Sequence, residues 1–219
     1  QAEHALPLLI DAVARRLGKV EDKAERIAEE NAKLAAELEG LQPHTAHHQV
    51  IREVLGEDGI FGDDLTQVAY SARIGFPVYK PRGYVCAGYA GTLGWGLPAG
   101  LGAKIAMEDR RVLTVQGDGG FMYGASELAT AVKYNIPLVT LVYSASAYGT
   151  VKRIQEDRFG HNRTIASDLV NPDIVKFVES FGAMALRADP TPEGLRKALE
   201  EDFNANGPAV VEMPVPQIY

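Results

Sequence analysis

The 219-residue sequence predicts an α/β fold: a mostly parallel sheet with helices on both faces, preceded by a helical linker. Short, continuously apolar segments such as "RVLTVQ" (111–116) and "IPLVTLVY" (136–143) are typical of strands buried on both faces. Segments with helical spacing of apolar residues alternate with these strands, which favours crossover helices and parallel pairing. The content of 46% hydrophobic and 23% charged residues is that of a globular protein.

Residues 4–39 read as helix. Apolar residues recur at helical spacing from Leu6 to Leu17, and Gly18 is the expected stop. Residues 21–39 are rich in Ala, Glu and Lys and carry only a thin apolar stripe, so a solvated helix is favoured over one that pairs with another helix. The break at 40–43 places the domain boundary. We therefore expect a linker or tail of a preceding domain at 1–42 and one main domain at 43–219.

The main domain is predicted as a regular alternation of strands and helices. The predicted strands are 59–62, 111–116, 136–143 and 208–214, and the predicted helices are 44–55, 97–107, 124–134, 172–181 and 191–203. Asp63-Asp64 follows the first of these strands. Residues 73–88 are rich in aromatic residues, Pro and Gly, and we expect a loop there.

Composition excludes several classes of partner. The net charge of −7 disfavours nucleic acid as a partner. The sequence contains no apolar run of 18 residues, so we expect no membrane span. The single cysteine, Cys86, suits a reducing, cytoplasmic location, and we expect it to be a small buried residue rather than a reactive thiol.

The motif Gly117-Asp118-Gly119-Gly120 lies between a predicted strand and a predicted helix. Glycines allow a ligand to approach the backbone closely, and an aspartate suits Mg²⁺ and a diphosphate, although a plain turn with a capping aspartate fits equally well. The loop "AYGTVKR" follows the next strand and should lie beside Asp118. The glycines of "GYAGTLGWGLPAGLGAK" indicate either a ligand-binding turn or close helix packing.

Four histidines and a tryptophan are weaker candidates. His44, His47 and His48 could form a metal cluster, but a solvated first turn of helix is favoured. His161 lies in a polar loop that could cover the site, and Trp95 is expected to serve packing rather than substrate contact.

Several motifs in order resemble the pyrophosphate-binding domain of thiamine-diphosphate-dependent enzymes, and most closely the acetolactate-synthase-like decarboxylases and carboligases. The motifs are "AGTLGWGLPAGLGA", "VLTVQGDGGFMYGASELATAVKYNIPLVTLVY", "AYGTVKR", "NPDIVKFVESFGA" and "NGPAVVEMPV". The resemblance implies that the intact polypeptide uses thiamine diphosphate and Mg²⁺ to decarboxylate a 2-oxo acid, with possible transfer to a second carbonyl.

The resemblance also implies residue roles. Asp118 would bind the metal together with the backbone carbonyl near Ala147, and Leu93 would hold the cofactor in its bent form. The implied cofactor-binding residues are Gly91, Thr92, Leu93, Gly117, Asp118, Gly119, Gly120, Tyr148, Gly149 and Thr150. No residue of this chain is assigned a catalytic role.

Two features depart from the family pattern. The family carries a metal-binding asparagine where this chain has Ala145, within Ser144-Ala145-Ser146, and a methyl group cannot coordinate Mg²⁺. The unchanged flanks indicate a substitution, deliberate or natural, on an intact loop. In addition, nothing here resembles the pyrimidine-binding domain, which in the family supplies a catalytic glutamate from the same or another subunit.

We therefore expect the chain to be inactive in isolation and to bind the cofactor and Mg²⁺ weakly or not at all. A homo-oligomer is expected, because the family site forms at a subunit interface and residues 84–97 and 121–134 should present an apolar face. Two alternatives remain open: a non-catalytic association module, and the separate pyrophosphate subunit of a two-chain oxo-acid decarboxylase.

Overall fold

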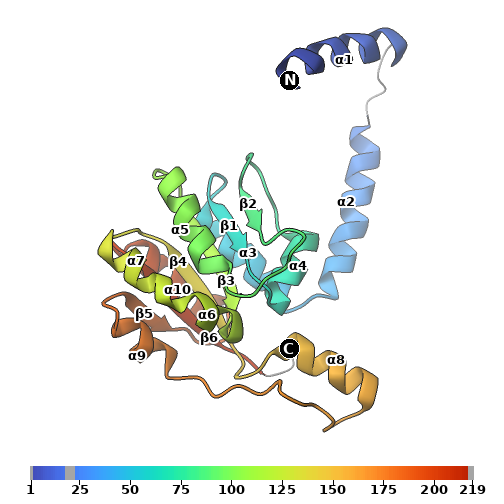
Figure 1. Cartoon of the computed structure of the whole chain (residues 1–219). Coiled ribbons are helices and arrows are strands. Elements are labelled where there is room, and N and C mark those ends of the chain that lie inside the picture. Colours follow the sequence, from blue (N-terminus) through green and yellow to red (C-terminus); the bar gives the residue numbers. More distant parts are fainter. Residues whose placement is uncertain (1, 18–22, 217–219) are drawn as a thin grey trace. The chain divides into compact units, whose positions relative to one another are not determined.

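The computed structural model describes residues 2–17 and 23–216, which form two compact units divided between Gly40 and Leu41. The first unit consists of two helices, α1 (Ala2–Leu17) and α2 (Ala24–Glu39), which Figure 1 shows in blue. None of their described residues is buried, and the apolar side chains of Ile27 and Leu34 are exposed. The predicted stop at Gly18 lies outside the described residues.

The second unit is built on a six-stranded sheet in which every described pair of neighbouring strands is parallel. The order is β2-β1-β3-β4-β6-β5. The strands are β1 (Ile60–Asp63), β2 (Tyr84–Cys86), β3 (Val112–Gly117), β4 (Val139–Ser144), β5 (Met184–Arg187) and β6 (Ala209–Pro214). The central strands β3, β4 and β6 are buried except at their last residues, as their continuous apolar sequences predict. The predicted parallel α/β sheet is confirmed.

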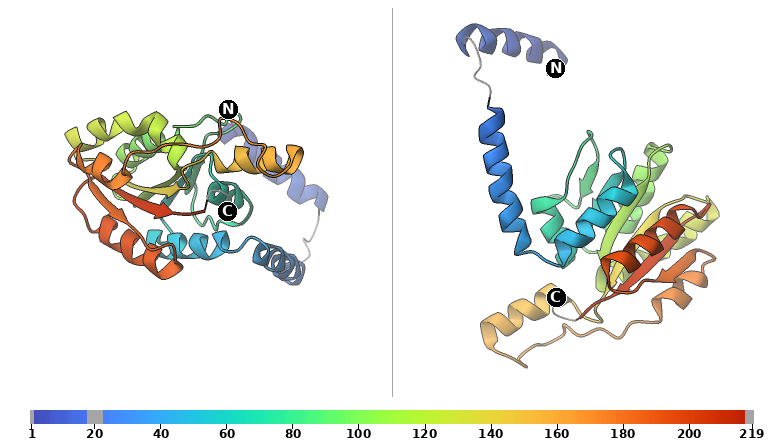
Figure 2. Two further views of the ribbon diagram at one scale, coloured as in Figure 1. Left: turned by 90° about the horizontal axis from the view of Figure 1, so that it is seen from below. Right: turned by 180° about the vertical axis from the view of Figure 1, so that it is seen from behind.

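Helices cover both faces of this sheet (Figure 2). One face packs on α3 (His44–Leu55), α4 (Gln67–Gly75) and α10 (Pro192–Phe203). The other packs on α5 (Gly96–Ala106), α6 (Asp118–Gly124), α7 (Leu128–Lys133) and α9 (Ile174–Glu179). Phe61 and Phe121 are fully buried on opposite faces, and burying a side chain of that size contributes about 1.5–3 kcal/mol.

The segment 73–88, expected to be a loop, is partly regular. Residues 67–75 form α4, and the short strand β2 pairs with the outer side of β1. Three residues at a sheet edge are too few for an alternation pattern, which is why the sequence did not predict the strand. The expected burial of Cys86 is also wrong, because Cys86 ends this edge strand and is exposed.

The expectation for the histidines of α3 is also wrong, because His47 and His48 are buried. The helix lies against α4 and α10, so the side chains of His47 and His48 face the domain interior, while His44 is half-buried. His47 Nδ1 lies 3.0 Å from the Tyr143 hydroxyl, and His48 Nε2 lies 2.9 Å from the Val68 carbonyl oxygen. The part of the chain that the structure describes contains no cluster of three or more His, Cys, Asp or Glu residues suited to a metal.

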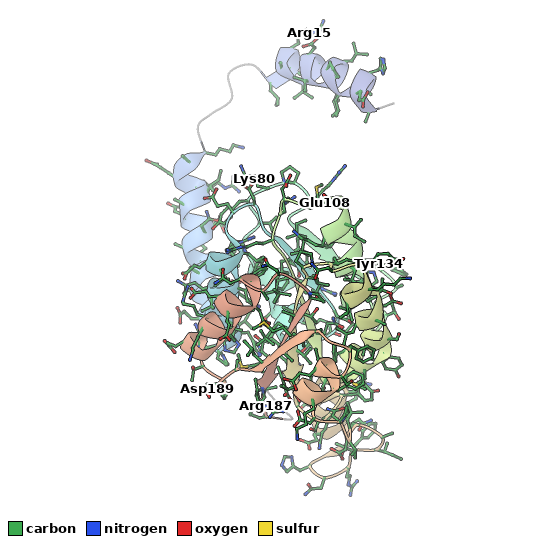
Figure 3. The ribbon with its side chains drawn as sticks, turned by 90° about the vertical axis from the view of Figure 1, so that its left-hand side faces the viewer. Arg15, Lys80, Glu108, Tyr134, Arg187 and Asp189 are labelled. Atoms are coloured by element: carbon green, nitrogen blue, oxygen red, sulfur yellow. The ribbon has the colours of Figure 1, made fainter. Side chains whose placement is uncertain are left out.

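Three further elements were not predicted. Helix α8 (Gly149–Phe159) lies beyond the carboxyl ends of the strands in Figure 1, and it has no buried residue that would produce an apolar pattern. Strand β5 forms the other sheet edge, where Arg187, labelled in Figure 3, pairs with Glu212 and Asp173. Helix α6 begins at Asp118 itself, earlier than the expected helix at 124–134. Among the described helices, none is long and apolar enough to cross a membrane.

Candidate functional site

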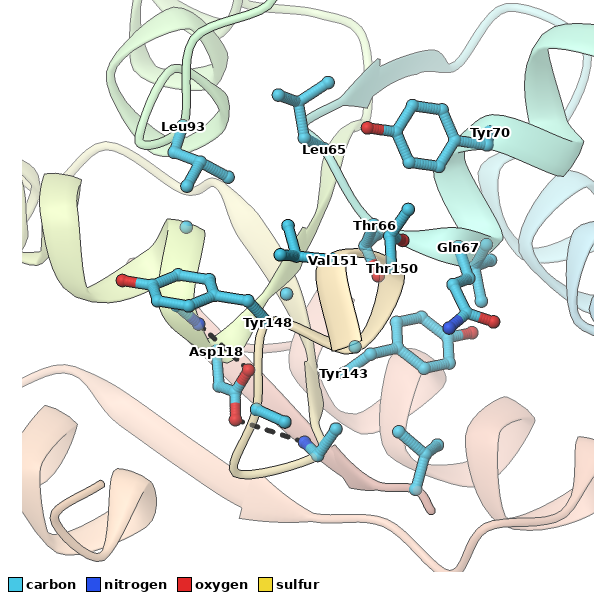
Figure 4. A pocket seen from close by; sticks show the side chains of 18 of the residues that line it. Leu65, Thr66, Gln67, Tyr70, Leu93, Asp118, Tyr143, Tyr148, Thr150 and Val151 are labelled. Carbon is cyan, nitrogen blue, oxygen red and sulfur yellow. Dashed lines mark hydrogen bonds between the residues drawn. The ribbon is translucent and has the colours of Figure 1, made fainter. Parts of the chain in front are cut away.

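The site lies where the order of the strands reverses. The chain leaves β1 for β2 on one side, while β3 lies on the other side of β1. In open parallel sheets such a switch point leaves a crevice at the carboxyl ends of the strands, where ligands bind. A cavity of about 280 Å³ lies there, lined by the loops after β1, β3 and β4 and by the start of α8 (Figure 4).

Most of the residues that the sequence singled out for the cofactor line this one cavity. These are Leu93, Gly117, Asp118, Gly119, Gly120, Ala147, Tyr148, Gly149 and Thr150. Gly91 and Thr92 belong to the same turn as Leu93 but are not among the lining residues. The fold thus brings together three segments that are far apart in sequence, while their contact with a cofactor stays a prediction.

Close packing requires a glycine at position 119, in the middle of the Gly117–Gly120 motif. A Cβ atom on Gly119 would lie 2.4 Å from Cε1 of Tyr148, closer than any real contact. The aromatic ring of Tyr148 therefore lies directly over the backbone of the motif, as Figure 4 shows beside Asp118. A Cβ atom on Gly117 or Gly120 would meet nothing closer than 3.5 Å, and both residues line the cavity, where a ligand can approach their backbone.

The first turn of α8 provides donors for an anion. Its N-cap residue, Tyr148, makes no side-chain capping hydrogen bond. Within the described part of the chain, the backbone N–H groups of Gly149, Thr150 and Val151 have no acceptor, although all three residues line the cavity. Free N–H groups at the start of a helix favour a phosphate both by hydrogen bonding and by the helix dipole.

Asp118 is buried and holds two loops in place. Its Oδ2 accepts hydrogen bonds from the backbone N–H of Ala145 (3.1 Å) and Ser146 (2.6 Å) and from Nδ2 of Asn171 (2.7 Å). Among the described residues, its Oδ1 accepts a hydrogen bond only from the N–H of Gly119, at 2.9 Å. Oδ2 is therefore fully occupied by donors, and Oδ1 is the oxygen with remaining capacity.

The described residues around the cavity do not form a complete set of Mg²⁺ ligands. Asp118 Oδ1 is one suitable oxygen, and the Ala147 carbonyl, which accepts no hydrogen bond from the described residues, is a second. Ala145 lines the cavity, but its methyl side chain offers no ligand, and its N–H donates to Asp118 Oδ2. The free N–H groups and the open glycine backbone fit a diphosphate, whereas only these two oxygens are available to a metal, and their contact with Mg²⁺ stays a prediction.

Several lining residues were missed by the sequence analysis. Thr66, Gln67 and Tyr70 come from the start of α4, which the sequence did not predict, and Val151 and Ile154 come from α8. Asn171 precedes the helix predicted at 172–181, and no pattern links it to Asp118, 53 residues away in the chain. Asp63-Asp64, directly after the predicted strand 59–62, was the one sequence feature that indicated polar side chains at this edge of the sheet.

The floor of the cavity is connected to the buried histidines. Tyr143 lines the cavity, and its hydroxyl lies 3.0 Å from Nδ1 of His47. Burial, together with the neighbouring His48, lowers the pKa of His47 to about 4, so this ring is neutral at pH 7. The neutral His47 ring and the Tyr143 hydroxyl thus form a hydrogen-bonded pair beside the cavity.

Residues 64–213 match the family model described as thiamine pyrophosphate enzyme, C-terminal TPP binding domain. The acetolactate synthase of Bacillus subtilis is 40% identical over 140 residues, which are 64% of this chain and 24% of that protein. A probable 2-ketoarginine decarboxylase of Pseudomonas aeruginosa is 35% identical over 189 residues, covering 83% of this chain and 33% of that one. The chain therefore spans between about a quarter and a third of these relatives.

Solved structures agree with the sequence relatives. The benzoylformate decarboxylase of Polynucleobacter necessarius superposes with a TM-score of 0.70 at 25% identity, covering 80% of this chain and 33% of that one. The match to the family model includes the Gly117–Gly120 motif, the cavity loops after β1, β3 and β4, the strands β2 to β5 and all but the last residue of β6. The chain belongs to the thiamine-diphosphate-dependent enzymes and corresponds to their acetolactate-synthase-like C-terminal, cofactor-binding domain.

Proposed function

We propose that this chain is the diphosphate-binding half of a 2-oxo acid decarboxylase or carboligase, and that it is inactive in isolation. The observation that carries the proposal is the uncapped first turn of α8, which faces the same cavity as Gly117–Gly120. Two of the relatives named above are decarboxylases, which supports this reaction class. The identity of the 2-oxo acid and of any acceptor depends on residues outside this cavity.

Each wall of the cavity has a distinct task. The N–H groups of Gly149, Thr150 and Val151 bind the diphosphate, and the bare backbone at Gly117 and Gly120 lets it approach. Leu93, which also lines the cavity, orients the remainder of the cofactor. When bound, thiamine diphosphate supplies the electron sink for loss of CO₂.

The remaining lining is mostly apolar and includes Leu65, Tyr70 and Ile154. Such walls exclude water and strengthen the hydrogen bonds made to a bound anion. We propose that a pyrimidine-binding domain, from the same polypeptide or another subunit of a cytoplasmic homo-oligomer, completes the cavity. Asp118 and the Ala147 carbonyl would hold Mg²⁺ only weakly, because Ala145 supplies no ligand.

Ala145 favours a second candidate, a non-catalytic association module that keeps the fold but not the metal. The separate pyrophosphate subunit of a two-chain decarboxylase is a variant of the first proposal. CO₂ release from a panel of 2-oxo acids separates these cases. It would be measured with thiamine diphosphate and Mg²⁺ for this chain alone and for a polypeptide or mixture that contains the pyrimidine-binding domain.

We expect release only when the pyrimidine-binding domain is present, and loss of that release in Asp118→Ala. No release from any 2-oxo acid in the complete assembly would favour the association module. Release from this chain alone would contradict the proposal that half of the site is missing.

A further inference from the structure

Asp64, the second residue of the Asp63-Asp64 pair, has no role in the site described so far. Its side chain is completely buried at the carboxyl end of β1, where its N–H continues the ladder by donating to the Val115 carbonyl at 2.9 Å. Because β1 and β3 are neighbours, this carboxylate lies at the switch point between the first strand and the Gly117–Gly120 motif.

The carboxylate accepts backbone hydrogen bonds from a turn thirty residues further along the chain. Oδ2 accepts the N–H of Gly94 at 3.1 Å and the N–H of Gly96 at 3.0 Å, while Oδ1 accepts the adjacent N–H of Leu65 at 2.6 Å. Gly96 is the first residue of α5, whose own N-cap, Trp95, makes no side-chain capping bond. Asp64, which follows strand β1, therefore caps the N-terminus of α5, and its negative charge complements the helix dipole.

The turn is confined on its other side as well. Gly94 has a φ of +81°, and a Cβ atom there would lie 2.6 Å from Cβ of Tyr123 on α6. The turn is thus held between Asp64 and α6, and Leu93 projects from it into the cavity. The same carboxylate also lies against the Gly117–Gly120 motif, because a Cβ atom on Gly120 would lie 3.5 Å from Asp64 Oδ2.

We propose that Asp64 is a positioning residue that fixes the Leu93 turn relative to the Gly117–Gly120 motif. One carboxylate thus contacts two segments of the cavity wall and sets their separation, although it does not line the cavity itself. The relevance of this separation to the cofactor rests on the proposed function, whereas the positioning itself does not.

Trp95, the only tryptophan of the chain, provides a direct probe, since it lies between the two glycines that Asp64 holds. In Asp64→Asn, the amide has one oxygen for three N–H donors, so the turn should loosen. We expect the emission of Trp95 to shift to longer wavelength and its acrylamide quenching constant to rise roughly twofold while the far-ultraviolet circular dichroism is kept.

Asp63→Asn is the matched control. Asp63 is adjacent, equally buried, and bonded to Arg73 and the Tyr84 hydroxyl rather than to the turn. It should destabilise the protein without changing the quenching of Trp95. A folded Asp64→Asn protein with unchanged quenching, or an equal change in both variants, would overturn the proposal.

Amide exchange on the unaltered chain gives a result even if Asp64→Asn does not fold. The Gly94 and Gly96 amides should exchange at least about tenfold more slowly than the Thr92 amide of the same turn, because a charged acceptor holds them. Equal rates would refute the positioning role. If Trp95 responds as expected but the complete enzyme binds no thiamine diphosphate, the positioning role stands and the proposed function fails.

Discussion

Protonation of His47, which lies beneath the cavity next to Tyr143, should destabilise the domain. The imidazole is 1% exposed, and its Nδ1 pairs with the hydroxyl of Tyr143, which lines the site. Burial and the nearby His48 lower its pKa from 6.5 to about 4. The unfolded chain therefore takes up a proton near pH 6.5, whereas the folded chain does so only near pH 4, so acid favours unfolding.

The size of the effect follows from these two pKa values. The stabilisation is fully present above pH 6.5 and is lost as the pH falls toward 4, to a total of about 3 kcal/mol. Between pH 8 and pH 5 the loss due to His47 alone is about 2 kcal/mol, a large part of the stability of an ordinary domain. Burial also lowers the pKa of His44 and His48, which adds to the slope.

Urea unfolding at a series of pH values measures this loss. In His47→Gln, which cannot titrate, the decrease in unfolding free energy between pH 8 and pH 5 should be smaller by about 2 kcal/mol than in the unaltered chain. His161→Gln is the control, because that side chain is 84% exposed. An unchanged pH dependence in His47→Gln would refute the assignment of a buried neutral histidine.

Three further predictions concern the cavity and its surroundings. Gly119→Ala should destabilise the fold by about 1–3 kcal/mol in urea unfolding, because its Cβ would lie 2.4 Å from the ring of Tyr148, and Tyr148→Ala should remove most of that penalty. Ala145→Asn should raise the Mg²⁺ affinity of the complete enzyme about tenfold or more in a calorimetric titration, and Asp118→Ala should abolish the gain. If the gain survives Asp118→Ala, residue 145 does not face the metal. The exposed apolar residues of 84–97 and 121–134, such as Tyr123, should drive dimer or larger assembly in light scattering, and a monomer at high concentration would contradict this.

The sequence predicted the parallel sheet and the cavity loops because those signals are local. Strands buried on both faces are continuously apolar, as β3 and β4 are, and the glycine motifs have fixed positions at the ends of strands. Helix α8 has no such signal, since it buries no residue, and edge strand β2 is too short to show a period.

The remaining errors concern tertiary environment. Whether His47 faces solvent depends on α4 and α10 packing against α3, and no local pattern encodes that. The same holds for Asn171 and Asp64, whose hydrogen bonds join segments 53 and at least 30 residues apart. Polar residues whose partners are distant in sequence become functional candidates only once the fold is known.

Calorimetric titration of this chain with thiamine diphosphate, in the presence and absence of Mg²⁺, tests the central claim most directly. The cavity offers free N–H groups for the diphosphate, whereas Ala145 offers no side-chain ligand for Mg²⁺, and we propose that a pyrimidine-binding domain is needed to complete the site. We predict no saturation below about 100 µM and little effect of Mg²⁺. Binding with a dissociation constant near 1 µM, worth about 8 kcal/mol, would show that this chain holds a complete cofactor site and would contradict the account.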